Sequence, residues 1–142
     1  MQNALKFQVQ ASWQGEQGSV ARTERGSVTL DTTMQGAAAG LNPVETLLAA
    51  LAACMFKGTE RVRESLALDF TSMEIDLQAV RPATEARIES ITYQVRIATN
   101  ADDRKLELLH ENLKKHGTIY NTVRQGTNLS GTIVRELNQA MV

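Results

Sequence analysis

The 142-residue sequence predicts a single α+β domain over residues 1–142, in which antiparallel sheet packs on apolar helices. Segments with alternating apolar and polar residues come in groups of three, two and one, and two helical segments separate the groups. The longer helical segment, residues 42–66, includes ten consecutive apolar residues from 47 to 56. A helix that is apolar on every side must be enclosed by protein, so we expect this segment to form the core.

The N-terminal part of the chain predicts a three-stranded antiparallel meander. Residues 5–13 alternate between apolar and polar side chains, which indicates a half-buried strand. A glycine turn at 15–18 follows, and then two short strands at 19–23 and 27–30. Residues 34–41 are small, glycine-flanked and without a period, so we expect a loop that leads into the long helix and lines any pocket above it.

The long helix has a well-marked start. Asn42 is a suitable N-cap, and Pro43 fits the first helical position because its missing N–H is not needed there. Gly58 predicts either a kink or a close packing contact. An unbroken helix to Leu66 would be about 36 Å long at 1.5 Å per residue. That length exceeds the width of a small domain and suggests a partner subunit, whereas the apolar run is too short to cross a bilayer.

Three further strands are expected in the second half. Residues 73–80 and 87–98 alternate and predict a hairpin, with a β-bulge near Ser90 where the alternation shifts. Residues 128–134 predict the closing strand.

The second helix is expected between these strands, over residues 100–116. Acidic residues at its start and basic residues at its end suit the helix dipole. Gly117 is a natural stop. Its inner stripe is Leu106, Leu109, His110 and Leu113.

Composition excludes several function classes. A net charge of −1 argues against a nucleic-acid or anionic-membrane partner recognised by bulk charge, and neutral small molecules fit better. One cysteine excludes an internal disulfide, and the first residues lack a signal-peptide pattern, so we expect a cytoplasmic protein. The sequence has no dinucleotide or phosphate loop, no paired zinc histidines and no serine-nucleophile motif, and no metal or organic cofactor is expected. Cys54 remains as the candidate reactive residue.

The start of the long helix resembles a family signature. From Asn42 to Cys54 the residues read Asn-Pro-x-Glu-x-Leu-Leu-Ala-Ala-Leu-Ala-Ala-Cys. This run is similar to the signature of the OsmC/Ohr family, the osmotically inducible and organic hydroperoxide resistance proteins. The likeness extends through the glycine turn, the glycine-rich loop, the helices and the closing strand, and so covers most of the chain. It implies the OsmC-like fold, an intertwined homodimer whose sheets enclose the central helices and whose active sites lie at the dimer interface.

The resemblance also implies a thiol chemistry. In the family a peroxidatic cysteine reduces an organic hydroperoxide, a second cysteine resolves the sulfenic acid, and an external dithiol restores both thiols. Cys54 occupies the peroxidatic position, but Gly117 stands where the resolving cysteine is expected. Glu16 and Val44 replace an arginine and a glutamate of the hydroperoxide resistance branch, while Glu45 is retained as in many OsmC-like members.

A reactive Cys54 needs a cation, because the thiolate is the nucleophile and apolar surroundings disfavour it. Lys57, three residues further along the helix, is the nearest cation by sequence. The candidate catalytic residues are Cys54, Lys57 as its cation, and Glu45, which many OsmC-like members retain. Three arginines are alternatives to Lys57, from the strands or from a second chain: Arg22, Arg25 and Arg81.

Two functions are consistent with these residues. The first is a one-cysteine peroxidase, in which an external thiol reduces the sulfenic acid of Cys54. The second is a protein that binds an apolar ligand and has lost the redox chemistry, in which Cys54 is an inert core residue. Alkylation and peroxide consumption by Cys54 distinguish the two.

Overall fold

The computed structural model describes residues 3–136 and confirms the α+β class. The elements in order are β1 (Gln10–Trp13), the 3-10 turn η1 (Gly15–Gln17), β2 (Ser19–Thr23), β3 (Gly26–Leu30), α1 (Pro43–Arg63), β4 (Phe70–Val80), β5 (Ser90–Thr99), α2 (Asp103–His116), α3 (Thr118–Val123) and β6 (Asn128–Glu136). The chain divides into two compact units, Met1–Leu47 and Leu48–Val142.

The first unit is the expected antiparallel meander, in the order β1-β2-β3. The first strand is shorter than predicted, because pairing starts only at Gln10, opposite Arg22. Residues 3–8 lie beyond the end of β2, and no strand among the described residues pairs with them, so Phe7 is 89% exposed despite the apolar alternation. Alternation alone indicates which face of a strand is apolar, but it does not supply a partner strand.

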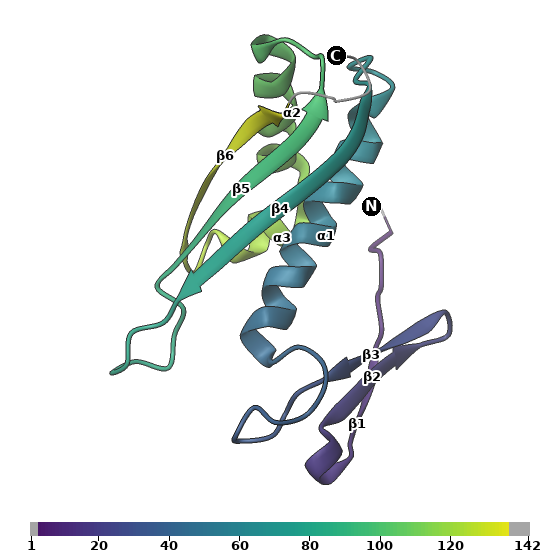
Figure 1. The fold of residues 1–142 in the computed structure, drawn as a ribbon. Helices are drawn as coiled ribbons and strands as arrows, with labels where there is room; N and C mark the ends of the chain where they lie inside the picture. The colour runs from purple at the N-terminus through teal and green to yellow at the C-terminus, as the bar shows by residue number, and fades with distance from the viewer. Residues whose placement is uncertain (1–2, 137–142) are drawn as a thin grey trace. The chain divides into compact units, whose positions relative to one another are not determined.

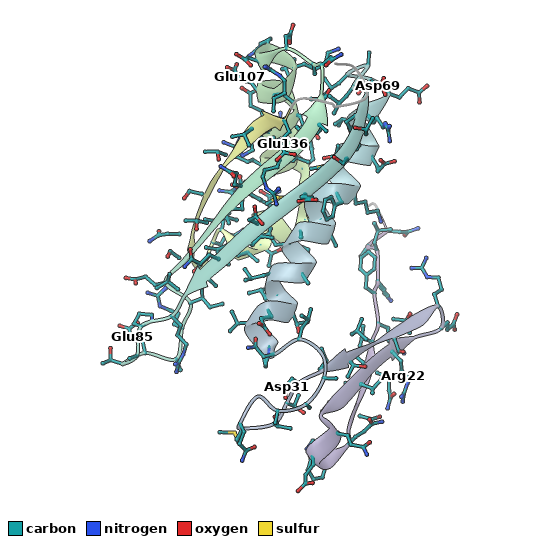
Figure 2. All side chains as sticks on the ribbon, viewed as in Figure 1. Arg22, Asp31, Asp69, Glu85, Glu107 and Glu136 are labelled. Atoms are coloured by element: carbon teal, nitrogen blue, oxygen red, sulfur yellow. The ribbon has the colours of Figure 1, made fainter. Side chains whose placement is uncertain are left out.

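The loop before α1 is ordered by one carboxylate, Asp31, which is labelled in Figure 2. Its Oδ1 accepts hydrogen bonds from the N–H and the hydroxyl of Thr33 and from the N–H of Ala38. The Thr33 hydroxyl is the main reason that the pKa of Asp31 is lowered. A bridge between Leu30 and Leu41 closes the loop. The loop therefore has local order without any hydrophobic period.

A reciprocal capping box starts α1. The Glu45 N–H donates to Asn42 Oδ1 at 2.8 Å, and the Asn42 N–H donates to Glu45 Oε1 at 2.9 Å. Pro43 is the first helical residue, as predicted. The 21 residues of α1 span about 32 Å.

A Schellman-type turn ends the helix. The Leu68 N–H donates to the Arg63 carbonyl, the Ala67 N–H donates to the Glu64 carbonyl, and Ala67 has a left-handed φ of 48°. Regular α1 stops at Arg63, but its closing turn continues to Leu66, the predicted end.

The second unit contains a three-stranded sheet in the order β4-β5-β6. β4 and β5 form the predicted antiparallel hairpin. β6 pairs with β5 in parallel, so the expectation of purely antiparallel sheet is wrong for this pair. The reason is the connection, because α2 and α3 form a crossover that returns the chain to the same end of the sheet.

The predicted bulge near Ser90 is also wrong. Ser90 pairs in register with Val80, and the irregularity lies at the other end of the hairpin, between Phe70 and Ser72. The shifted alternation came from residues 87–89, which precede β5.

The three helices lie on one face of this sheet (Figure 1). The core between them consists of Leu51, Met55, Val62, Leu68, Ile91, Tyr93, Val95, Ile97, Leu106, Leu109, Leu113 and Tyr120. At Gly58, a Cβ would lie 2.7 Å from Leu113 Cδ2, so the close-packing prediction is confirmed and α1 runs through without interruption.

Candidate functional site

Cys54 lies on α1 and is half-buried, with a free thiol. The neighbouring Leu51 and Met55 are fully buried in the core. Within residues 3–136, the Cys54 Sγ takes part in no hydrogen bond. The thiol therefore stands at the margin of the core, where part of its surface stays accessible.

Gly117 faces this thiol. A Cβ built on Gly117 would lie 3.1 Å from Cys54 Sγ and 2.7 Å from the Leu113 carbonyl oxygen. Gly117 has φ −78° and ψ 115°, so the left-handed geometry typical of a glycine stop is not found. Crowding rather than backbone conformation favours glycine here. The position where the family resemblance places a second thiol is thus beside Cys54.

Of the other two candidates, Glu45 is engaged elsewhere and Lys57 is exposed. The carboxylate of Glu45 accepts the capping hydrogen bond from Asn42. Lys57 lies almost one helical turn after Cys54 and forms no ion pair with any residue from 3 to 136. No hydrogen bond or ion pair joins either residue to Cys54 in this part of the chain. Their catalytic roles stay predictions.

Two further positions differ from the family pattern, and three arginines are the alternatives to Lys57 as the cation near Cys54. Glu16 is exposed in η1, and Val44 is half-buried in the first turn of α1. Arg81 is exposed just after β4, and Arg22 and Arg25 belong to the first unit. A role for any of these arginines at Cys54 stays a prediction.

A largely buried polar cluster joins three elements of the second unit, and sequence reasoning assigned it no role. Tyr93 on β5 has its hydroxyl 2.6 Å from His110 Nε2 on α2 and 3.3 Å from the Tyr120 hydroxyl on α3. The rings of His110 and Tyr120 both meet the Tyr93 ring edge to face. Burial raises the pKa of Tyr93, and its bond to Tyr120 adds to the shift. Tyr93 is 4% exposed in the core, where a hydroxyl needs a partner.

The described residues 3–136 include no group of three or more His, Cys, Asp or Glu side chains arranged to hold a metal ion. In the same range, no helix combines the length and the apolar character needed to cross a membrane.

Comparison with known families decides the assignment. The family model described as OsmC-like protein matches residues 35–130, which include α1 with Cys54, the sheet hairpin, α2 and α3. The chain belongs to the OsmC-like family. A search of the curated proteins found no match.

Solved structures show the same OsmC-like fold. An OsmC-like protein from Mycoplasma pneumoniae matches with a TM-score of 0.84 and 15% identity, over 92% of this chain and 97% of that one. An organic hydroperoxide resistance protein OsmC from Legionella pneumophila matches with a TM-score of 0.69 and 17% identity, over 92% and 98%. The organic hydroperoxide resistance protein OhrB of Bacillus subtilis matches with a TM-score of 0.65 and 15% identity, over 90% and 98%. At these identities the likeness establishes the fold of this OsmC-like protein.

Proposed function

We propose that this OsmC-like protein is a one-cysteine thiol peroxidase that reduces organic hydroperoxides at Cys54. The observation that supports the proposal is the placement of Gly117 against the Cys54 thiol, in a chain that carries the family signature. The accessible margin of the core gives Cys54 a setting that an apolar hydroperoxide can approach.

In the first step the Cys54 thiolate attacks the terminal oxygen of the hydroperoxide. The O–O bond breaks, an S–O bond forms, and the alkoxide takes up a proton to become an alcohol. Cys54 is oxidised to a sulfenic acid and the peroxide is reduced by two electrons. Lys57 is the proposed source of positive charge for the thiolate. Glu45 can act at Cys54 only by giving up its capping bond to Asn42.

In the second step an external dithiol restores the enzyme. One of its thiols attacks the sulfenic sulfur and water leaves, which produces a mixed disulfide with Cys54. Its second thiol then attacks that disulfide and releases Cys54 as a thiol. Gly117 has no sulfur, so the chain has no internal group for this step. The net reaction converts hydroperoxide and dithiol into alcohol, water and disulfide.

We also propose that the protein functions as a homodimer. Ala49, Ala53 and Phe56 lie on one stripe of α1, at i, i+4 and i+7, and all three are exposed in the single chain. Phe56 is 40% exposed. A second copy covering this stripe would remove it from water, as the apolar character of α1 requires.

The test is the consumption of an organic hydroperoxide by the reduced protein with a dithiol present, with Cys54→Ser as the matched control. We expect turnover in the parent and only background consumption in Cys54→Ser. A parent that is folded, fully reduced and no faster than Cys54→Ser would overturn the peroxidase proposal.

The alternative, an apolar-ligand binding protein, is supported by two observations: no residue from 3 to 136 forms a hydrogen bond with Cys54 Sγ, and the sequence has no second cysteine. It predicts that Cys54→Ser binds a fluorescent fatty-acid probe as tightly as the parent does. Saturable binding without peroxide consumption would favour this function.

A further inference from the structure

The hydroxyl of Tyr93 forms the middle of a hydrogen-bond chain that links three elements, β5, α2 and α3. Tyr93 and Tyr120 are 4% and 5% exposed. Gly131 of β6 is paired with Tyr93 and leaves no space for a Cβ beneath the Tyr93 ring. The phenol is therefore held in one place by the neighbouring strand.

One direction of this hydrogen-bond chain gives each hydroxyl proton an acceptor. If His110 is neutral with Nε2 unprotonated, Tyr120 donates to Tyr93 and Tyr93 donates to His110. If Nε2 carries a proton, it donates to Tyr93, and Tyr93 must turn its own proton toward Tyr120. The Tyr120 hydroxyl has no other hydrogen-bond partner in residues 3–136. Its proton is then left without an acceptor in a buried site, which is costly.

The surroundings of His110 on α2 also favour its neutral form. Burial lowers the pKa of His110, and Lys114 on the same helix lowers it further. Asp103 and Glu107 of α2 and Arg135 of β6 line the groove of about 430 Å³ that His110 borders, and Figure 2 labels Glu107 on α2.

Each of these three charges has a partner of opposite sign. Arg135 pairs with Asp103, and Glu107 pairs with Arg104. Tyr93 faces His110 from β5, and Tyr120 of α3 is bonded to the same Tyr93 hydroxyl.

The last element in the hydrogen-bond chain, α3, begins beside Cys54. A Cβ on Gly117, the N-cap residue of α3, would lie 3.1 Å from Cys54 Sγ and 3.1 Å from Tyr120 Cβ. When the chain is reversed, the Tyr120 proton has no acceptor, which destabilises the packing of α3 and of its N-cap residue Gly117, which covers one side of the thiol.

We propose that Tyr93 is a positioning residue for Cys54, which holds α3 against the thiol through Tyr120, and that protonation of His110 reverses the chain and exposes Cys54. This regulation rests on the proposed function, in which Cys54 is a reactive thiol. Under this regulation the reactivity of the Cys54 thiol rises in acid, although His110 does not contact the thiol.

The experiment measures the rate at which Cys54 reacts with dithiodipyridine, a disulfide reagent that remains reactive in acid, between about pH 4.5 and 8. In the parent we expect a step of about fivefold below the ordinary histidine pKa of about 6.5, which is the change expected when one buried hydroxyl proton is left without an acceptor. His110→Gln keeps an acceptor for Tyr93 but cannot titrate, so its rate at neutral pH should match the parent and the step should be absent. His116→Gln removes the exposed histidine of the same helix and should keep the step.

Tyr93→Phe lacks the hydrogen-bond chain at every pH. We therefore expect its Cys54 to react with dithiodipyridine about fivefold faster than the parent at neutral pH, with no step. A step that persists in His110→Gln overturns the proposal, as does one that is lost in His116→Gln. Because His110→Gln retains the hydrogen bond, the test stands even if Tyr93→Phe does not fold.

The reaction with dithiodipyridine needs no hydroperoxide turnover, which separates this inference from the proposed function. A protein that shows the step but consumes no hydroperoxide supports the chain and contradicts the peroxidase. A protein that turns over hydroperoxide but shows no step supports the peroxidase and contradicts the proposed role of the hydrogen-bond chain. A Cys54 that is unreactive at every pH overturns both.

Discussion

Gly117→Cys should create a disulfide with Cys54. The Cβ of the new side chain would lie 3.1 Å from Cys54 Sγ, close to the roughly 3 Å that separates Cβ from the partner sulfur in a disulfide. The main-chain φ of −78° suits a cysteine. The obstacle is the Leu113 carbonyl oxygen, 2.7 Å from the same Cβ, so the turn between α2 and α3 must shift by a few tenths of an ångström.

Two opposing effects determine the stability of this variant. Crowding against Leu113 should destabilise the reduced form by about 1–3 kcal/mol, as overpacking usually does. The bridge closes a loop of about 60 residues, which the chain-entropy relation values at about 4 kcal/mol. The oxidised variant should therefore be more stable than the parent by about 1–3 kcal/mol, and the reduced variant less stable.

Denaturant unfolding with and without a reductant measures both effects, and thiol titration after mild peroxide counts the bridge. Gly117→Ser has nearly the same volume and no sulfur, so it reports the crowding alone. With an internal thiol at high effective concentration, the bridged pair should also turn over hydroperoxide faster than the parent. A folded Gly117→Cys that keeps two free thiols after mild peroxide would refute the geometry and the alignment of Gly117 with the resolving position.

Three further predictions follow from the structure. Excess peroxide should carry Cys54 to sulfinic and sulfonic acid because no internal thiol intercepts the sulfenic acid, and mass spectrometry should find two or three oxygen atoms added there; an unmodified Cys54 would contradict the peroxidase proposal. Ala53→Glu should place a charge in the exposed stripe of α1 and halve the mass measured by light scattering, whereas a parent that is already monomeric at micromolar concentration would exclude the homodimer. Ala67→Gly should raise the free energy of unfolding by about 0.5–1 kcal/mol, because it relieves a left-handed residue at some cost in chain entropy. Chemical denaturation checks this last change, with Ser65→Gly as a control expected to destabilise, and an unchanged midpoint for Ala67→Gly would contradict it.

Features set by local chemistry could be predicted from the sequence. Asn42 and Pro43 marked the start of α1, and the acidic and basic ends of α2 marked its limits, because capping and the helix dipole act within one turn. The position of Gly117 beside Cys54 followed from the family resemblance, since the geometry depends on how α2 packs against α1.

Features that depend on a distant partner could not be predicted in this way. Phe7 alternates correctly, but β2 ends before reaching it. The parallel pairing of β6 depends on the path of the crossover rather than on the residues of β6. Likewise, Tyr93, His110 and Tyr120 come from three separate elements, and no spacing in the sequence brings their polar atoms together.

The parallel pairing of β6 has a consequence for the order of folding. β5 is the middle strand of its sheet, and during synthesis one of its edges stays open until residues 128–136 have left the ribosome. In that interval the nascent chain displays unpaired N–H and C=O groups beside Ile91, Val95 and Ile97, which is a template for aggregation. Long-range parallel pairing is also slow to form. Chaperone dependence should therefore be greatest for chains that end just before β6.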